Sequence, residues 1–133
     1  MADCIFCKIA TGEIPANKIH EDDDLLAFLD IMPVRPGHIL VIPKKHFATV
    51  LETPDNLLSK MTTLSKKIGK KIIEELGADG INITSNTNPA AGQKVFHAHF
   101  HIIPRQENDG LQPWPQKSYN PGQAEDIAAK LTL

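Results

Sequence analysis

The apolar positions between residues 53 and 77 recur every three or four residues, which is the spacing of one face of an α-helix. They are Leu57, Met61, Leu64, Ile68 and Ile72. Thr53 and Pro54 suit the N-cap and first position of a helix, and Gly77 is a natural stop after it. The pattern therefore predicts one long helix that ends near residue 76, with one buried stripe and a solvated lysine face.

Four shorter segments have the β-branched, apolar or alternating character of strands. They are residues 25–29, 38–42, 80–84 and 95–103, and Pro43 and Pro104 follow the second and the fourth. Near the N-terminus, Gly12 and Pro15 limit any helix to about two turns. Short loops join the strands and only one long helix intervenes. The order favours an α+β domain with a mostly antiparallel sheet over a doubly wound parallel one.

The 133 residues fit a single domain of ordinary size, with a core over residues 1–105. Residues 105–122 are polar and rich in proline, which predicts an irregular stretch at the start of a tail over residues 106–133. Asn120 and Pro121 suit the start of a last short helix that runs through Leu131. No internal repeat and no second domain are expected.

Composition and charge narrow the classes of function. The formal net charge is −2, so no basic field attracts a nucleic acid polymer. The chain has no apolar run of about 18 residues and no signal-peptide pattern at its start, so we expect a cytoplasmic protein that does not cross a membrane. In a reducing compartment, a stable disulfide between the two cysteines, Cys4 and Cys7, is not expected.

Three of the six histidines lie within five residues, at His97, His99 and His101. Strand alternation places them on one face, with Phe96, Ala98, Phe100 and Ile102 on the core face. An exposed strand could carry histidine by chance, but serine, threonine or lysine would serve that purpose equally well. Alternate residues stand roughly 6.5 Å apart, so three histidines on a regular strand cannot share one metal ion. We therefore expect divided roles, with an imidazole nucleophile among them.

The run His-Ala-His-Phe-His-Ile-Ile over residues 97–103 resembles the motif of the histidine triad (HIT) family, His-φ-His-φ-His-φ-φ. Other segments resemble the family in the same order, over about residues 3–105, and the likeness is to the bacterial Hit and Hint-like branch. They are residues 5–9, 27–31, 37–46 and 92–96. The resemblance implies a HIT-like fold with a sheet of about five strands and short terminal helices.

The resemblance also implies residue roles. HIT enzymes cleave the bond from a nucleoside α-phosphate to an amine or a phosphate through a nucleotidyl-histidine intermediate, so His99 would be the nucleophile. The other expected catalytic residues are His101, Gln93 and His38. Asp30 would bind the ribose hydroxyls, and Asn86, Gly92 and Lys94 would lie near the phosphates. The base would lie between Ile5, Phe6, Ile9, Phe28, Leu29 and Ile31.

Some of these residues also have plainer interpretations. Asn86 and Asp30 are each typical of turns, and the apolar set is typical of a core. Lys94 stands where the family often has serine or threonine, so the resemblance leaves the leaving group open. A lysine adds positive charge, and we expect it to favour more acidic leaving groups.

Cys4 and Cys7 form a Cys-x-x-Cys pair that has three interpretations. A thioredoxin-like redox pair needs a preceding strand, for which residue 4 leaves no room. Two unconnected buried thiols, or half of a tetrahedral zinc site, remain. In the fold that the resemblance implies, His46 and His97 approach each other, and they would complete a structural zinc site with both cysteines.

The sequence leaves several functions open. The first is a purine nucleoside phosphoramidase or nucleotidyl hydrolase, and the second is a dinucleoside polyphosphate hydrolase. A nucleotide-binding regulator with incidental catalysis and a metal-binding module are alternatives from other classes. The resemblance implies a purine nucleotide substrate and a homodimer. No metal is needed for the chemical step, because a histidine supplies the nucleophile.

Overall fold

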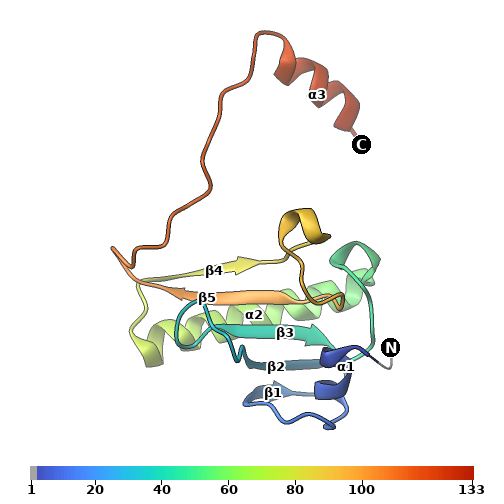
Figure 1. The fold of residues 1–133 in the computed structure, drawn as a ribbon, viewed down its shortest axis with the longest axis vertical. Coiled ribbons are helices and arrows are strands. Elements are labelled where there is room, and N and C mark those ends of the chain that lie inside the picture. The colour runs from blue at the N-terminus through green and yellow to red at the C-terminus, as the bar shows by residue number, and fades with distance from the viewer. Residues whose placement is uncertain (1–2) are drawn as a thin grey trace.

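The computed structural model describes residues 3–133, and its centre is a five-stranded antiparallel sheet (Figure 1). The strands are β1 (Lys18–Glu21), β2 (Leu25–Leu29), β3 (Ile39–Pro43), β4 (Gly80–Thr84) and β5 (Phe100–Arg105). Their order is β1-β2-β3-β5-β4, and every neighbouring pair is antiparallel. The predicted α+β class with a mostly antiparallel sheet is confirmed.

Three α-helices accompany the sheet. They are α1 (Ile5–Ala10), α2 (Asp55–Leu76) and α3 (Gln123–Leu131), and short 3-10 turns span Val50–Glu52 and Pro89–Ala91. The long helix α2 runs along one face of the sheet (Figure 1), and α1 packs on the opposite face through Phe6 and Ile9. Within residues 3–133, no helix is long and apolar enough to cross a membrane.

The apolar stripe predicted for α2 is confirmed, because all five of its residues are buried and Met61, Leu64, Ile68 and Ile72 pack against the sheet. Gly77 ends the helix with a φ of 66°, the left-handed conformation that favours glycine. The predicted cap is wrong. The helix begins at Asp55, and the Thr53 hydroxyl donates to the carbonyl of Thr49 instead of accepting from the first turn.

The sheet separates two apolar clusters. On the α2 face, residues such as Ala27, Val41 and Ile102 pack against the helix stripe. On the opposite face, Phe28 and Leu40 pack with Phe6 of α1 and with other apolar side chains. The short strand β1 has only exposed residues, and these residues show no apolar alternation that would predict a strand.

The histidine strand differs from its prediction. The strand β5 begins at Phe100, and residues 95–99 are not part of the sheet. The pairing of β3 with β5 stops at Phe100, and the backbone N–H of Ala98 donates to the carbonyl of Phe47, 2.7 Å away. Phe96, which was expected in the core, is 46% exposed. His97 and His99 lie outside the strand, so the alternation of side chains along a strand does not determine where these two side chains point.

The end of β5 also differs. Pro104 does not stop the strand, because it pairs with Ile81 of β4 and the strand continues to Arg105. Proline has no backbone N–H, but no hydrogen bond to β3 is lost at Pro104, because the pairing of β3 with β5 reaches only Ile102. Beyond it, Asp109 accepts hydrogen bonds from the Arg105 guanidinium and fixes the start of the tail. The tail then runs away from the β4 edge to α3 (Figure 1).

Candidate active site

Four imidazole rings gather around the start of β5, on the sheet face opposite α2. His99 and His101 have ring centroids 4.9 Å apart, and His101 and His38 have centroids 5.1 Å apart. Phe6 of α1 packs edge-on against His99 at 5.1 Å and against His97 at 5.9 Å. The first turn of the N-terminal helix therefore joins the histidines into one cluster.

Hydrogen bonds fix the neutral form of His99. Its Nδ1 lies 2.6 Å from the carbonyl oxygen of His97. A carbonyl oxygen only accepts hydrogen bonds, so Nδ1 must carry the proton. In the neutral ring, Nε2 then keeps a free lone pair, which is what a nucleophile at phosphorus requires.

His38 and His101 have the complementary arrangement. The backbone N–H of Val34 donates to Nδ1 of His38 at 3.0 Å, so the proton of His38 is on Nε2. This Nε2–H donates to Nδ1 of His101, 2.9 Å away. Neutral His101 therefore carries its own proton on Nε2. The cluster thus contains one ring with a free Nε2 lone pair, His99, beside a ring with an Nε2–H donor, His101.

Burial keeps these rings neutral. It lowers the pKa values of His38 and His99 below their usual range. Burial and the neighbouring His99 and His38 lower the pKa of His101 to about 4. At pH 7, the neutral forms that the hydrogen bonds require are therefore the populated ones.

Asp30 lies just beyond the end of β2, at the edge of the cluster. One of its carboxylate oxygens accepts a hydrogen bond from the backbone N–H of Met32. The other lies 3.7 Å from Nε2 of His38, and the side chain is 21% exposed. The carboxylate therefore faces the histidine cluster and still has acceptor capacity for a ligand.

The loop before β5 contributes fewer side chains that could contact a substrate than expected. Gly92 has a φ of 96°, which favours glycine, and it lies beside the half-buried Asn86. Lys94 is exposed. Gln93 is buried, and both hydrogens of its amide bond to the backbone, at the carbonyls of Ala48 and Val95.

The side-chain oxygen of Gln93 is also occupied, because it accepts a hydrogen bond from the backbone N–H of Asn88. The structure therefore gives Gln93 a positioning role in the loop in place of the expected contact with the substrate.

The expected base pocket divides between the two faces of the sheet. Phe6, Ile9 and Phe28 belong to the apolar cluster on the histidine face. Leu29 is a correction, because it packs with the opposite cluster, under α2. Ile5 is 42% exposed and Ile31 is 83% exposed, so both side chains are open to a ligand.

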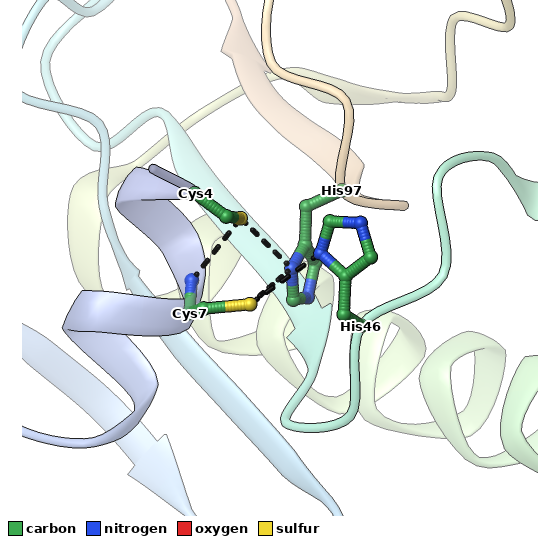
Figure 2. Close-up of side chains that lie close together, drawn as sticks. All are labelled: Cys4, Cys7, His46 and His97. Atoms are coloured by element: carbon green, nitrogen blue, oxygen red, sulfur yellow. Dashed lines mark hydrogen bonds between the residues drawn. The ribbon is translucent and has the colours of Figure 1, made fainter. Parts of the chain in front are cut away.

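The two cysteines meet His46 and His97 at one point (Figure 2). Nδ1 of His97 lies 3.4 Å from Sγ of Cys4 and 3.5 Å from Sγ of Cys7. Nδ1 of His46 lies 3.4 Å from Sγ of Cys7. Tetrahedral zinc with ordinary Zn–S and Zn–N bonds requires S···N edges of about 3.6 Å, so the spacing of these atoms fits the ion.

The protonation state of His97 supports the same conclusion. Its Nε2 lies 2.7 Å from the carbonyl oxygen of Pro43, so Nε2 carries the proton and Nδ1 presents a lone pair to the two sulfur atoms. A hydrogen bond from the outer nitrogen to a carbonyl is the usual support of a metal-bound histidine. Zinc would supply a closed, structural centre here, with four protein ligands and no open position.

A second group of possible ligands does not fit a metal as well. Asp30, His38 and His101 also bring their side-chain atoms together. However, Nε2 of His38 carries a proton, because its Nδ1 accepts from the Val34 N–H. Nε2 therefore has no lone pair for an ion, and these residues are better described as part of the catalytic cluster.

Three supporting groups were not predicted from the sequence. They are the backbone N–H of Val34, the carbonyl of Pro43 and the hydroxyl of Ser85, which donates to the carbonyl of His99 at 2.8 Å. Ser85 directly precedes the predicted Asn86, and that neighbourhood was the only signal for it. The two backbone groups carry no signal in the sequence.

The family model described as "HIT domain" matches residues 11–108 of this chain. The chain therefore belongs to the HIT family, and the matched range contains all four clustered histidines but neither cysteine. A HIT family protein from Bacillus subtilis has a solved structure that aligns with a TM-score of 0.89 at 41% identity, over 97% of this chain and 94% of that one.

Two further comparisons concern chemistry. The adenylylsulfatase HINT3 of Arabidopsis thaliana is 45% identical over 116 residues, which are 87% of this chain and 58% of that protein. A zinc-bound histidine triad family protein from Mycobacterium smegmatis aligns with a TM-score of 0.79 at 39% identity. That alignment covers 93% of this chain and 87% of the other.

Proposed function

We propose that this protein is a nucleotide hydrolase that transfers a nucleoside 5′-monophosphoryl group to His99 and then to water. The observation that carries the proposal is the bond from Nδ1–H of His99 to the His97 carbonyl, which leaves Nε2 as a free lone pair. Membership of the HIT family and the similarity to an adenylylsulfatase support the same class of reaction.

In the first step, Nε2 of His99 attacks the α-phosphorus, and the bond from phosphorus to the leaving group breaks with its electron pair on the leaving group. His101 supplies an Nε2–H donor beside the nucleophile, and it stabilises the phosphoryl oxygens or protonates the leaving group. In the second step, water attacks phosphorus, the bond to Nε2 breaks, and the nucleoside monophosphate leaves. His38 positions His101 through its own Nε2–H.

Asp30 supports recognition of the nucleoside. A carboxylate at the edge of the cluster accepts hydrogen bonds from a vicinal diol such as the ribose hydroxyls. Apolar side chains on the same face, Phe6, Ile9 and Phe28, together with the exposed Ile5 and Ile31, provide surfaces for a base. A purine is the proposed base. Asn86 and the backbone at Gly92 lie on the loop expected to meet the phosphates.

The metal site has a structural role in this proposal. Cys4, Cys7, His46 and His97 would hold a zinc ion that fixes α1 to the start of the histidine segment. His97 is both a metal ligand and the residue whose carbonyl orients His99. The ion therefore supports catalysis through positioning and takes no part in the chemical step.

Two finer questions concern the leaving group and the assembly. An amine would make the protein a purine nucleoside phosphoramidase, a second nucleotide would make it a dinucleoside polyphosphate hydrolase, and the exposed Lys94 favours an acidic leaving group. We propose a homodimer, as the family resemblance implies. The alternative function is nucleotide-binding regulation with incidental catalysis.

The variant His99→Ala separates an enzyme from a binding protein. It removes the nucleophile and leaves Asp30 and the apolar surfaces in place. We expect turnover of adenosine phosphoramidates and diadenosine polyphosphates to fall by at least about 1000-fold. Binding of adenosine monophosphate, measured by calorimetry, should change by less than about tenfold. Full turnover in this variant would contradict the assigned nucleophile.

A further inference from the structure

The C-terminal helix α3 presents an apolar stripe with no partner on its own domain. Ala124, Ile127, Ala128 and Leu131 follow the spacing of one helix face. Every residue of α3 except Ala124 is exposed. Figure 1 shows the helix standing apart from the sheet at the end of the tail. A helix this short is marginal in water by itself, so its stripe requires a surface to cover it.

A large groove lies on the other side of the sheet from the histidines. This α2 groove runs between α2 and strands β1–β3, and its volume is about 1310 Å³. Its apolar floor consists of Leu25, Leu29, Ile39, Leu64, Ile68 and Ile72. A nine-residue helix is about 13.5 Å long and about 10 Å across, a cylinder of roughly 1100 Å³. The groove is therefore large enough to receive a helix of this length.

The charges of the two surfaces are complementary. The α2 rim of the groove carries Lys67 and Lys71, and α3 carries Glu125 and Asp126 in its first turn. At the other end, the groove has the acidic turn 22–24, and the last turn of α3 carries Lys130. Within residues 3–133, Lys67 makes no ion pair. These charges match when α3 lies antiparallel to α2.

The path of the tail indicates which molecule receives the helix. The tail leaves β5 and passes beyond β4, one edge of the sheet, whereas the groove lies beside β1 to β3, toward the opposite edge (Figure 1). Its start is fixed by Arg105 and Asp109 and by the bond from Gln106 to the carbonyl of Gly77. The helix is thus directed away from its own groove and toward a neighbour beyond β4.

We propose that the α2 groove is the docking site for α3 of a second copy of this chain. The exchange is reciprocal, as in a closed two-fold dimer, and each apolar stripe fills the partner's groove. This inference names the surfaces of the proposed dimer, and it does not depend on the assigned chemistry of His99.

The first test changes α3 at two matched positions. Ile127→Glu places a charge on the stripe, and Ala129→Glu places the same charge off it. Analytical ultracentrifugation should show that Ile127→Glu raises the dimer dissociation constant at least tenfold, while Ala129→Glu changes it less than about twofold. Neither residue contributes to the domain core, so both variants should fold. Equal effects of the two variants would overturn the proposal.

The second test identifies the occupant of the groove. Thr63 lines the groove, whereas the neighbouring Thr62 is also exposed but does not line it. Zinc-loaded Thr63→Cys protein is mixed with an Ala128→Cys variant under mild oxidation, with Thr62→Cys as the control partner. We expect a covalent dimer from the Thr63→Cys mixture alone. No dimer, or a dimer equally abundant with Thr62→Cys, would contradict docking in the partner. A doubly substituted chain that cross-links only within itself would assign the groove to its own helix and overturn the exchange.

Discussion

Nδ1 of His99 lies 2.6 Å from the carbonyl oxygen of His97, and the ring of His97 faces Cys4 and Cys7. One residue therefore supplies both a proposed metal ligand and the hydrogen bond that orients the proposed nucleophile. The proposed metal centre and the proposed nucleophile are joined through a single stretch of backbone. Disturbing the metal site should consequently disturb the reaction as well as the fold.

Removal of the metal is expected to lower both stability and activity. Replacing the proposed ligand His46 with alanine should reduce bound zinc and lower the free energy of unfolding by about 2 kcal/mol or more, roughly a 7 °C fall in Tm. Metal analysis and calorimetry measure the two effects, and a chelator should reproduce them. The matched control is His20→Ala, at an exposed histidine outside the site. Native protein that contains no zinc would contradict the assignment.

The bond from His38 to His101 should matter for turnover more than for binding. Loss of the Nε2–H donor in His38→Ala releases His101 from its orientation, and we expect kcat to fall about 10- to 100-fold with little change in KM. Glutamine carries an amide N–H, so His38→Gln should recover part of the rate. The same loss in both variants would contradict a role for a hydrogen bond from position 38 to His101.

Stability should fall as the pH drops from 7 to 5. The pKa of His101 is about 4 in the folded protein and about 6.5 when unfolded, so the unfolded chain binds more protons between these values. The neutral folded ring therefore contributes stability that is present above pH 6.5 and is lost toward pH 4. Thermal melts should show that His101→Asn reduces this pH dependence by an amount on the order of 1 kcal/mol. His20→Asn, at an exposed position, serves as the control, and an equal reduction there would contradict the role of His101.

Lys94 should influence the choice of leaving group. Its positive charge in the loop before β5 favours departure of an anionic group over an amine. We expect Lys94→Ser to raise the ratio of kcat/KM for adenosine phosphoramidates to that for diadenosine polyphosphates several-fold. A substrate panel with both classes measures this ratio, and identical profiles for the two proteins would show that Lys94 does not influence the choice of leaving group.

Local patterns predicted much of the fold. The stripe of α2 and the strand β2 follow from spacing and residue type, because each buries one continuous face or run. The strand β4 follows from its alternating residue types, although none of its residues is fully buried. The start of β5 did not follow, since it depends on where Ala98 finds its acceptor at Phe47. Leu29 was assigned to the wrong face of its strand, although alternation from Phe28 would have corrected it.

The sequence predicted which residues form the candidate site, but it did not predict the protonation state of each histidine. The motif and the cysteine pair indicated which side chains meet, including Cys4 and His97, which are 93 positions apart. Which ring nitrogen carries each proton depends on partners such as the Val34 N–H and the Pro43 carbonyl. Every residue has a backbone, so the sequence holds no pattern that identifies these two.

The covalent intermediate tests the central proposal most directly. The protein is mixed with an adenosine phosphoramidate, quenched within milliseconds in alkaline denaturant to preserve a phosphorus–nitrogen bond, and mapped by peptide mass spectrometry. We expect an adenylyl group on His99 in the native protein and no adduct in His99→Ala. An adduct on His97 or His101, or turnover without any adduct on His99, would contradict the account.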